Sequence, residues 1–255
     1  MLVMTSMTHS DSPIMPIPSW STGTDAEIVQ AVARHYAGEI NLREFWSVGD
    51  ERTVYLHAMD ATSVRENHEA QTITMVLMNA GGKELAFHEG GYDECAFIVG
   101  QKNSLKEYGS MNSSSSNTGG WDSSDRRTWC NEVYYNAIPE TLRPIFKQHY
   151  NRTADGSGNT YKDSTDYFAL PAETEVYGGA SKASGSAESS LTQFEYYESA
   201  LNKIKLGGNT GSAYYWYMRS PVYNNSALFC AVDLDGNRSQ NAAGNSIGLA
   251  PFGVI

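Results

Sequence analysis

Long stretches of small polar residues interrupt this sequence of 255 residues and confine its regular structure to short segments. The stretches at 111–120, 151–164 and 178–190 are rich in Gly, Ser, Asn and Thr. Such residues favour turns and loops, so helices and strands must fit between them. The arrangement predicts an α+β fold with helices, short antiparallel strands and long loops. Long loops on a compact domain are often functional, and we expect function to reside on them.

The helices are predicted from their caps and apolar spacing. Thr24 to Glu27 has the pattern of a capping box, apolar residues follow at helical spacing as far as Tyr36, and Gly38 is a suitable terminator. A second helix is predicted from Trp121 to Ala137, burying Trp129, Val133 and Ile138.

Strands are predicted where apolar residues alternate or form short runs. Arg52 to Leu56 alternates like a half-buried strand, and Thr72 to Met78 is a stronger candidate that ends at a Gly-rich turn. The chain closes with an apolar segment, Gly248 to Ile255, that we expect to be a buried strand. The segment 178–190 is of low complexity and is predicted to be mobile.

No change in composition marks an internal domain boundary. Residues 1–22 are rich in Ser, Pro, Met and Thr without a period, and we interpret them as a flexible N-terminal arm. Residues 23–255 are predicted to form a single domain.

Charge and cysteine content exclude several functional classes. The net charge of −11 repels phosphate backbones and anionic membranes, so nucleic-acid binding is not expected. No apolar run approaches the roughly 18 residues of a membrane span, so no membrane insertion is expected. Cys95, Cys130 and Cys230 are widely spaced and lack a C-x-x-C pair. They are interpreted as buried apolar residues in a protein made in the reducing cytoplasm.

Catalytic and metal-binding patterns are weak, so we expect no catalytic residues, metal or cofactor. The histidines form no H-x-x-x-H or H-E-x-x-H spacing; they are His9, His35, His57, His68, His88 and His149. Glu173 and Glu175 lie two residues apart and are interpreted as a solvated helix start rather than an acid/base pair. Asp233 to Asn237 resembles the start of a calcium loop, but its glycine comes too early and a hairpin turn at Asp235-Gly236 is favoured.

The C-terminal block is the most informative segment. The aromatic run Tyr214 to Tyr217 leads through Ser220-Pro221 to residues 222–247, where Asn, Ser, Ala and Gly dominate. Small and amide side chains with occasional aromatics are typical of adaptable binding surfaces. A polar patch is thus held between two apolar segments.

Six motifs resemble those of a gut-associated bacterial and prophage family, many of whose members are similar to the variable proteins of diversity-generating retroelements. The motifs are Trp46–Asp50, Val99–Leu105, Gly119–Trp121, Arg126–Asn131, Asp166–Glu173 and Gly248–Gly253. The resemblance covers nearly all of residues 20–255. It implies a C-type-lectin-like fold, as in phage tropism determinants, with diversified residues in the last 40 or so positions.

The resemblance implies a ligand- or receptor-binding protein with a variable region at about 217–247. Retroelements of this kind turn Asn codons into NNY codons, which cannot encode Lys, Glu, Gln, Met or Trp. Residues 222–247 contain no Lys, Glu, Met or Trp, and Gln240 is the exception. Phe229, Cys230 and Val232 are interpreted as framework. The predicted ligand-binding positions are Tyr217, Val222, Tyr223, Asn224, Asn225, Ser226, Leu228, Ala231, Asp233, Asp235, Asn237, Ser239, Asn241, Asn245 and Ile247.

If the residues at these positions are to vary freely, other residues must supply the stability of the fold. We expect the scaffold core to contain Trp121, Trp129, Phe168, Leu170, Trp216, Leu249 and Phe252. The partner is expected to be a protein or a cell-surface ligand, with display on a phage virion or cell surface and attachment to a carrier through residues 1–22.

Two alternatives remain open at the level of sequence. One is an enzyme on the same fold that resembles the formylglycine-generating, sulfatase-modifying oxidases, which use cysteines. The other is a structural prophage protein without a specific ligand.

Overall fold

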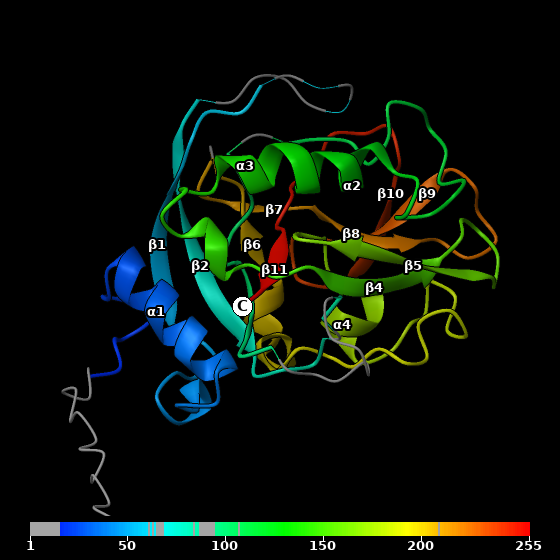
Figure 1. Cartoon of the computed structure of the whole chain (residues 1–255). Coiled ribbons are helices and arrows are strands. Elements are labelled where there is room, and N and C mark those ends of the chain that lie inside the picture. Colours follow the sequence, from blue (N-terminus) through cyan, green and yellow to red (C-terminus); the bar gives the residue numbers. More distant parts are fainter. Residues whose placement is uncertain are drawn as a thin grey trace, which may run out of the picture.

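The computed structural model describes residues 16–60, 62, 64, 69–83, 85–86, 95–106, 108–208 and 210–255. Within these ranges the chain combines helices with antiparallel sheets, which confirms the predicted α+β class (Figure 1). The α-helices are α1 (Asp25–Tyr36), α2 (Asp125–Trp129), α3 (Tyr135–Ala137) and α4 (Glu173–Tyr177), with a π segment η2 (Cys130–Tyr134) between α2 and α3. Short 3₁₀ turns are η1 (Leu42–Glu44), η3 (Arg143–Ile145), η4 (Glu195–Glu198) and η5 (Ala200–Lys203).

The described strands form four sheets, and every neighbouring pair is antiparallel. The largest sheet has the order β1 (Glu51–Leu56), β2 (Gln71–Asn79), β3 (Ile98–Gln101), β11 (Phe252–Val254). A three-stranded sheet has the order β10 (Arg238–Ala242), β9 (Leu228–Val232), β8 (Trp216–Pro221). The two hairpins are β4 (His149–Ala154) with β5 (Tyr161–Asp166), and β6 (Lys205–Leu206) with β7 (Ala213–Tyr214).

Helix α1 begins and ends as predicted. The Thr24 hydroxyl accepts the Glu27 N–H at 3.3 Å, and the Glu27 carboxylate accepts the Thr24 N–H at 2.8 Å. This reciprocal pair satisfies amides that have no partner within the helix. Gly38 follows the helix with φ of +72°, a conformation that costs glycine little.

The flexible arm predicted for residues 1–22 is wrong for residues 16–22; residues 1–15 lie outside the described part. Trp20 is fully buried, with its ring 5.5 Å from that of Trp46. The Arg52 guanidinium donates to the Trp20 carbonyl at 3.0 Å and to the Gly23 carbonyl at 2.7 Å. Packing removes the apolar surface of the Trp20 indole from water. The free energy gained orders this part of the chain although its composition is polar.

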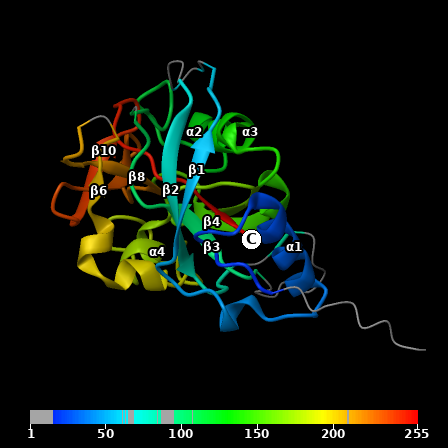
Figure 2. The same ribbon diagram turned by 90° about the vertical axis from the view of Figure 1, so that its left-hand side faces the viewer.

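The predicted strands at 52–56 and 72–78 are confirmed as β1 and β2, which pair from Glu51↔Val76 to Leu56↔Gln71. Strand β1 alternates exposed and buried residues, so one face of this sheet meets solvent. Strand β3 is buried throughout and pairs with β11, which confirms the predicted buried C-terminal strand. Figure 2 shows α1 and the three-stranded sheet on opposite sides of β1 and β2.

The predicted second helix starts later than expected, at Asp125. The Ser124 hydroxyl accepts the Arg127 N–H at 3.1 Å and caps the helix.

The side chains expected to form the scaffold core are all buried in one continuous cluster. They are Trp121, Trp129, Phe168, Leu170, Trp216, Leu249 and Phe252.

Candidate functional site

The three-stranded sheet divides the predicted display region into a buried and an exposed part. Every residue of β8 is buried, and so are Phe229 to Val232 of β9. The predicted framework role of Phe229, Cys230 and Val232 therefore agrees with their burial. The exposed part consists of the β8–β9 turn, the β9–β10 turn, much of β10 and the turn that follows it.

Four predicted ligand-binding positions are wrong as display positions because their side chains are buried. Tyr217 and Ala231 have no exposed surface, Val222 is 7 % exposed and Ile247 is 6 % exposed. The Tyr217 hydroxyl donates to the Ala242 carbonyl and, at 3.0 Å, to the Asn245 carbonyl. Burial raises the pKa of this phenol, which therefore remains a hydrogen-bond donor. Tyr217 thus fixes the turn after β10.

The other predicted positions reach the surface. Leu228, Asp233, Ser239 and Asn241 are half-buried. The exposed ones are Tyr223, Asn224, Asn225, Ser226, Asp235, Asn237 and Asn245. Gln240, the exception to the codon pattern, is also exposed on β10.

Polar loops from distant parts of the chain meet around the β8–β9 turn. They comprise residues 113–118, 156–159, 182–186 and 223–226, which we call the polar loop surface. The Tyr223 N–H donates to the Lys182 carbonyl at 2.8 Å, and the Asn224 N–H donates to the Ser157 carbonyl at 2.8 Å. Figure 1 shows the β4–β5 and β8–β9 turns at the same end of the molecule.

Asn117 links the first of these loops to the turn. Its buried side-chain amide donates to the carbonyls of Asn225 and Leu228, both at 2.7 Å, and its backbone N–H donates to the Ser226 carbonyl at 2.7 Å. The β8–β9 turn is therefore held mainly through main-chain atoms. Of its exposed side chains, Asn225 accepts the Ala227 N–H at 3.0 Å and the Tyr223 hydroxyl accepts from the Asn159 amide at 3.3 Å.

Gly120 allows this loop to approach the end of β4. Its φ is +60°, and a Cβ at this position would lie 2.1 Å from the Ala154 carbonyl oxygen. No other residue type fits there without moving the backbone.

The predicted mobility of residues 178–190 is wrong, because two buried carboxylates hold this segment. The Glu173 carboxylate accepts the N–H groups of Ser181, Lys182 and Ala183, the last at 2.7 Å. The Glu188 carboxylate accepts the Thr174 N–H at 3.0 Å and the Ser220 hydroxyl. Carboxylates that accept several N–H bonds are stable in the interior.

The interpretation of Glu173 and Glu175 as a solvated helix start is also wrong. Their exposed fractions are 0 % and 1 %. They point to separate partners, since Glu173 holds the 178–190 segment and Glu175 forms ion pairs with Lys83 and Arg219. Burial alone would raise the pKa of Glu175, but the two cations outweigh it and lower the pKa to about 2.

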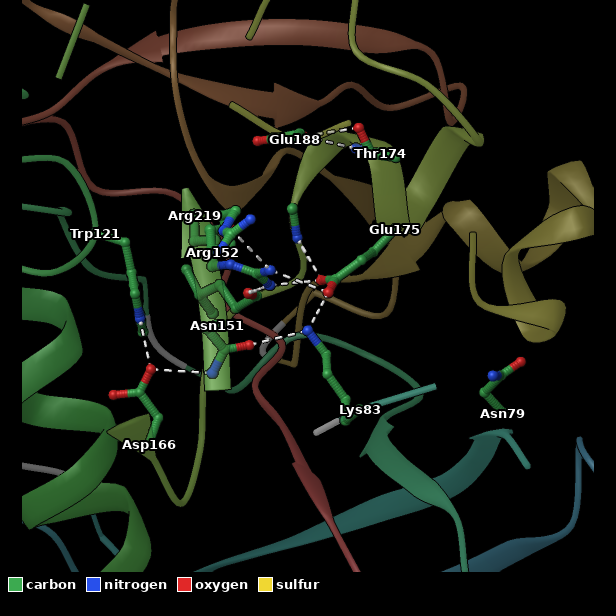
Figure 3. A network of polar contacts seen from close by, with 12 residues as sticks. Asn79, Lys83, Trp121, Asn151, Arg152, Asp166, Thr174, Glu175, Glu188 and Arg219 are labelled. Atoms are coloured by element: carbon green, nitrogen blue, oxygen red, sulfur yellow. Dashed lines mark hydrogen bonds and ion pairs between the residues drawn. The ribbon is translucent and has the colours of Figure 1, made fainter. Parts of the chain in front are cut away.

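Figure 3 shows Glu175 within a polar network that crosses the interior. The Lys83 ammonium donates to the Asn151 side-chain carbonyl at 3.1 Å, and the Asn151 amide donates to Asp166 at 3.0 Å. Asp166 also accepts the Trp121 indole N–H at 2.9 Å. A cavity of about 510 Å³ opens onto this network between Tyr150, Arg152 and residues 190–192, and its wall includes both Lys83 and Glu175.

The histidines and the suspected calcium loop take local roles. His9, His68 and His88 lie outside the described residues. His149 is buried, and burial followed by the nearby Lys83 charge lowers its pKa to about 3. Asp233 accepts the N–H groups of Asp235 and Asn237 at 2.9 and 2.8 Å, which closes the predicted hairpin turn between β9 and β10.

The burial of the three cysteines is relevant to the alternative that this protein is an oxidase that uses cysteines. Cys95, Cys130 and Cys230 are each fully buried, and burial raises the pKa of the Cys230 thiol well above its usual range. A thiol that stays protonated is a poor nucleophile. In the described ranges no three His, Cys, Asp or Glu side chains gather as metal ligands, and no helix there is long and apolar enough to cross a membrane.

A family model described as a domain of unknown function, DUF6273, matches residues 96–252, more than half of the chain. The chain belongs to the DUF6273 family. Searches of the curated proteins and of the solved structures find no match. The DUF6273 region contains the three-stranded sheet and the whole polar loop surface, whereas α1, β1 and β2 precede it.

Sequence reasoning missed the buried ionic network and the carboxylate anchors. Lys83 is 68 residues from Asn151 and 92 from Glu175, and nothing local in the sequence signals that they meet. The one available signal is Glu188, the acidic residue in a segment that, apart from Lys182, otherwise consists of small residues.

Proposed function

We propose that this protein binds a partner through its polar loop surface. The exposed residues of the β9–β10 turn and of the turn after β10 contact the same partner. The observation that carries this proposal is the separation of scaffold from surface at the β8–β9 turn. Its residues are fixed through main-chain hydrogen bonds to Asn117, Ser157 and Lys182. The side chains of Tyr223 and Ser226 can then change with little cost to folding, whereas Asn224 has a φ of +58° and Asn225 accepts the Ala227 N–H at 3.0 Å.

The chemistry of this surface supports recognition of a partner by adaptable contacts. It combines an exposed tyrosine, Tyr223, with the amides of Asn224 and Asn225 and with many hydroxyl groups. Tyrosine contributes a large contact area at low entropic cost, and small polar residues supply adaptable hydrogen bonds. The partner we propose is a protein or another cell-surface ligand.

We further propose a C-type-lectin-like scaffold and diversification by a retroelement of bacterial or prophage origin. Burial narrows the diversified set to the exposed positions Tyr223, Asn224, Asn225, Ser226, Asp235, Asn237 and Asn245, with half-buried neighbours at the rim. This part of the proposal requires a near-identical template repeat and a reverse transcriptase gene beside the coding sequence. A sequenced locus that has neither would contradict it.

Binding itself is tested with a surface variant and a matched control. The surface variant combines Tyr223→Ser and Ser226→Ala, and the control combines Thr53→Ala and Tyr55→Ser on the exposed face of β1. On arrays of glycans and cell-surface proteins, the wild type and the control should bind the same partner. The surface variant should lose binding by tenfold or more while keeping its melting temperature.

The same array separates the alternatives. Equal binding by the surface variant would contradict the proposed site, and absence of any partner would favour a structural protein. An oxidase activity that disappears when all three cysteines become serine would favour the enzyme.

A further inference from the structure

Three reactive groups meet in the interior next to the cavity, and the recognition surface does not use them. They are the amine of Lys83, in the segment after β2, the side-chain amide of Asn151 on β4, and the carboxylate of Glu175 on α4 (Figure 3). The Lys83 nitrogen lies 3.1 Å from the Asn151 carbonyl oxygen and contacts Glu175 directly. Their exposed fractions are 5 %, 0 % and 1 %.

Burial decides how readily Lys83 gives up its proton. The rings of Phe194 and Phe252 lie 5.9 and 5.3 Å from the Lys83 nitrogen, and their faces, like the Glu175 carboxylate, favour the charged ammonium. Burial lowers the pKa of Lys83 to about 8, although Glu175 opposes the shift. An amine in such a site gives up its proton far more readily than an exposed lysine.

The amide of Asn151 is held in one orientation. Its nitrogen donates to Asp166 at 3.0 Å, so its carbonyl oxygen faces Lys83. The carbonyl carbon is bonded to this oxygen, and attack requires the Lys83 nitrogen to move from the oxygen towards the carbon. Fixed reactants of this kind convert a slow bimolecular reaction into an intramolecular one.

We propose that Lys83 and Asn151 form an intramolecular isopeptide bond, with Glu175 holding the Lys83 nitrogen in place and relaying a proton. Lys83 releases one proton to water in the adjoining cavity, and the resulting amine attacks the Asn151 side-chain carbonyl carbon. The new C–N bond forms as the C–N bond to the amide nitrogen breaks. The Glu175 carboxylate passes a second proton from the attacking nitrogen to the leaving nitrogen, which departs as ammonia. Ammonia takes a proton from water in the cavity and leaves as ammonium, so that no oxidant or reductant is needed.

The cavity beside Tyr150 and Arg152 gives the departing ammonia a route to solvent, since its wall includes Lys83 and Glu175. The product joins the segment after β2 to β4 by a covalent bond. Such a cross-link restricts the unfolded chain over the 68 residues between the two positions. A recognition protein exposed to proteases would keep its scaffold intact.

The test is the intact mass of the purified full-length wild type after denaturation, followed by a peptide map. The proposal predicts a mass lower than that of the sequence by one ammonia, and a branched peptide that joins Lys83 to Asn151. A wild type at full mass overturns the proposal. So does a mass loss without the branched peptide, because cyclisation of an asparagine elsewhere also releases ammonia.

Variants assign the roles. Lys83→Arg and Glu175→Gln should both show no ammonia loss, and Lys162→Arg, an exposed control, should keep it. Because Glu175→Gln removes an ion-pair partner, its folding is checked by circular dichroism, and Lys83→Arg, which keeps the positive charge, serves as the second variant. Loss of ammonia from the Lys83→Arg protein would overturn the assignment.

Discussion

At the scale of single residues, function and stability are divided between neighbours in the sequence. Tyr217 and Tyr223 lie six positions apart, yet the first has no exposed surface and the second is 41 % exposed. Both residues are tyrosines, so the residue type does not predict that the first is buried and the second exposed. Position in the sheet decides it, since Tyr217 lies in a strand buried on both faces and Tyr223 in the turn that follows.

Removal of the Tyr217 hydroxyl should destabilise the protein. Tyr217→Phe leaves the carbonyls of Ala242 and Asn245 without this donor, which should cost about 1–3 kcal/mol. Tyr223→Phe, the matched control, should change stability by less than about 0.5 kcal/mol. Urea unfolding of both variants measures the difference, and equal stabilities would show that Tyr217 is not part of the scaffold.

Asn117 gives a second test at this scale. Asn117→Ala removes two buried hydrogen bonds to the carbonyls of Asn225 and Leu228 and should cost about 2–3 kcal/mol. Ser226→Ala, in the exposed part of the turn, should lie within about 0.5 kcal/mol of the wild type. A larger effect at Ser226 than at Asn117 would contradict a turn held by its main chain.

At the scale of elements, the sequence predicts what depends on neighbours along the chain. The capping box of α1, the strands β1 and β2 and the turn at Asp235-Gly236 are all local patterns, and the structure confirms them. The segment 178–190 was predicted wrongly because its order depends on Glu173, which contacts Ser181 to Ala183 from another element. A segment of small polar residues becomes ordered when a buried group from another element binds its backbone amides.

Hydrogen exchange tests this anchored segment. The amides of Lys182 and Ala183 should exchange slowly in the wild type because the buried Glu173 carboxylate accepts them. In Glu173→Gln, where one carboxylate oxygen becomes an amide, at least one of these amides should lose protection. Exchange of both at the unfolded rate in the wild type would contradict the assignment.

At the scale of the whole molecule, the interior contains an unusual set of ionisable groups. Lys205 is fully buried, with its nitrogen 2.8 Å from the Gln101 carbonyl and 5.0 Å from the centre of the Trp216 ring. Burial lowers its pKa to about 7. Glu175 and His149 have lowered pKa values of about 2 and about 3.

These values predict a stability that rises with pH. A lysine with a folded pKa near 7 and an ordinary unfolded value of 10.5 binds fewer protons when folded, so stability should increase from about pH 7 to pH 10. His149 loses its contribution as the pH falls from 6.5 towards 3, and Glu175 as it falls from 4.5 towards 2. Acid should therefore unfold the protein.

Melting temperatures at pH 7 and pH 9 check the alkaline arm. The wild type should melt higher at pH 9, and Lys205→Met should remove most of that rise, whereas Lys162→Met, an exposed control, should not. A wild type that melts lower at pH 9 would contradict the assignment of Lys205.

The central claim is that the exposed C-terminal residues determine binding while the buried scaffold determines folding. Two libraries displayed on yeast test it directly. One randomises Tyr223, Asn225, Ser226, Asn237 and Asn245, and the other randomises Tyr217, Val222, Ala231 and Ile247. We expect most members of the first library to resist protease and to yield binders to a chosen protein, whereas most members of the second should be degraded. Equal protease resistance in the two libraries, or a first library that yields no binders, would contradict it.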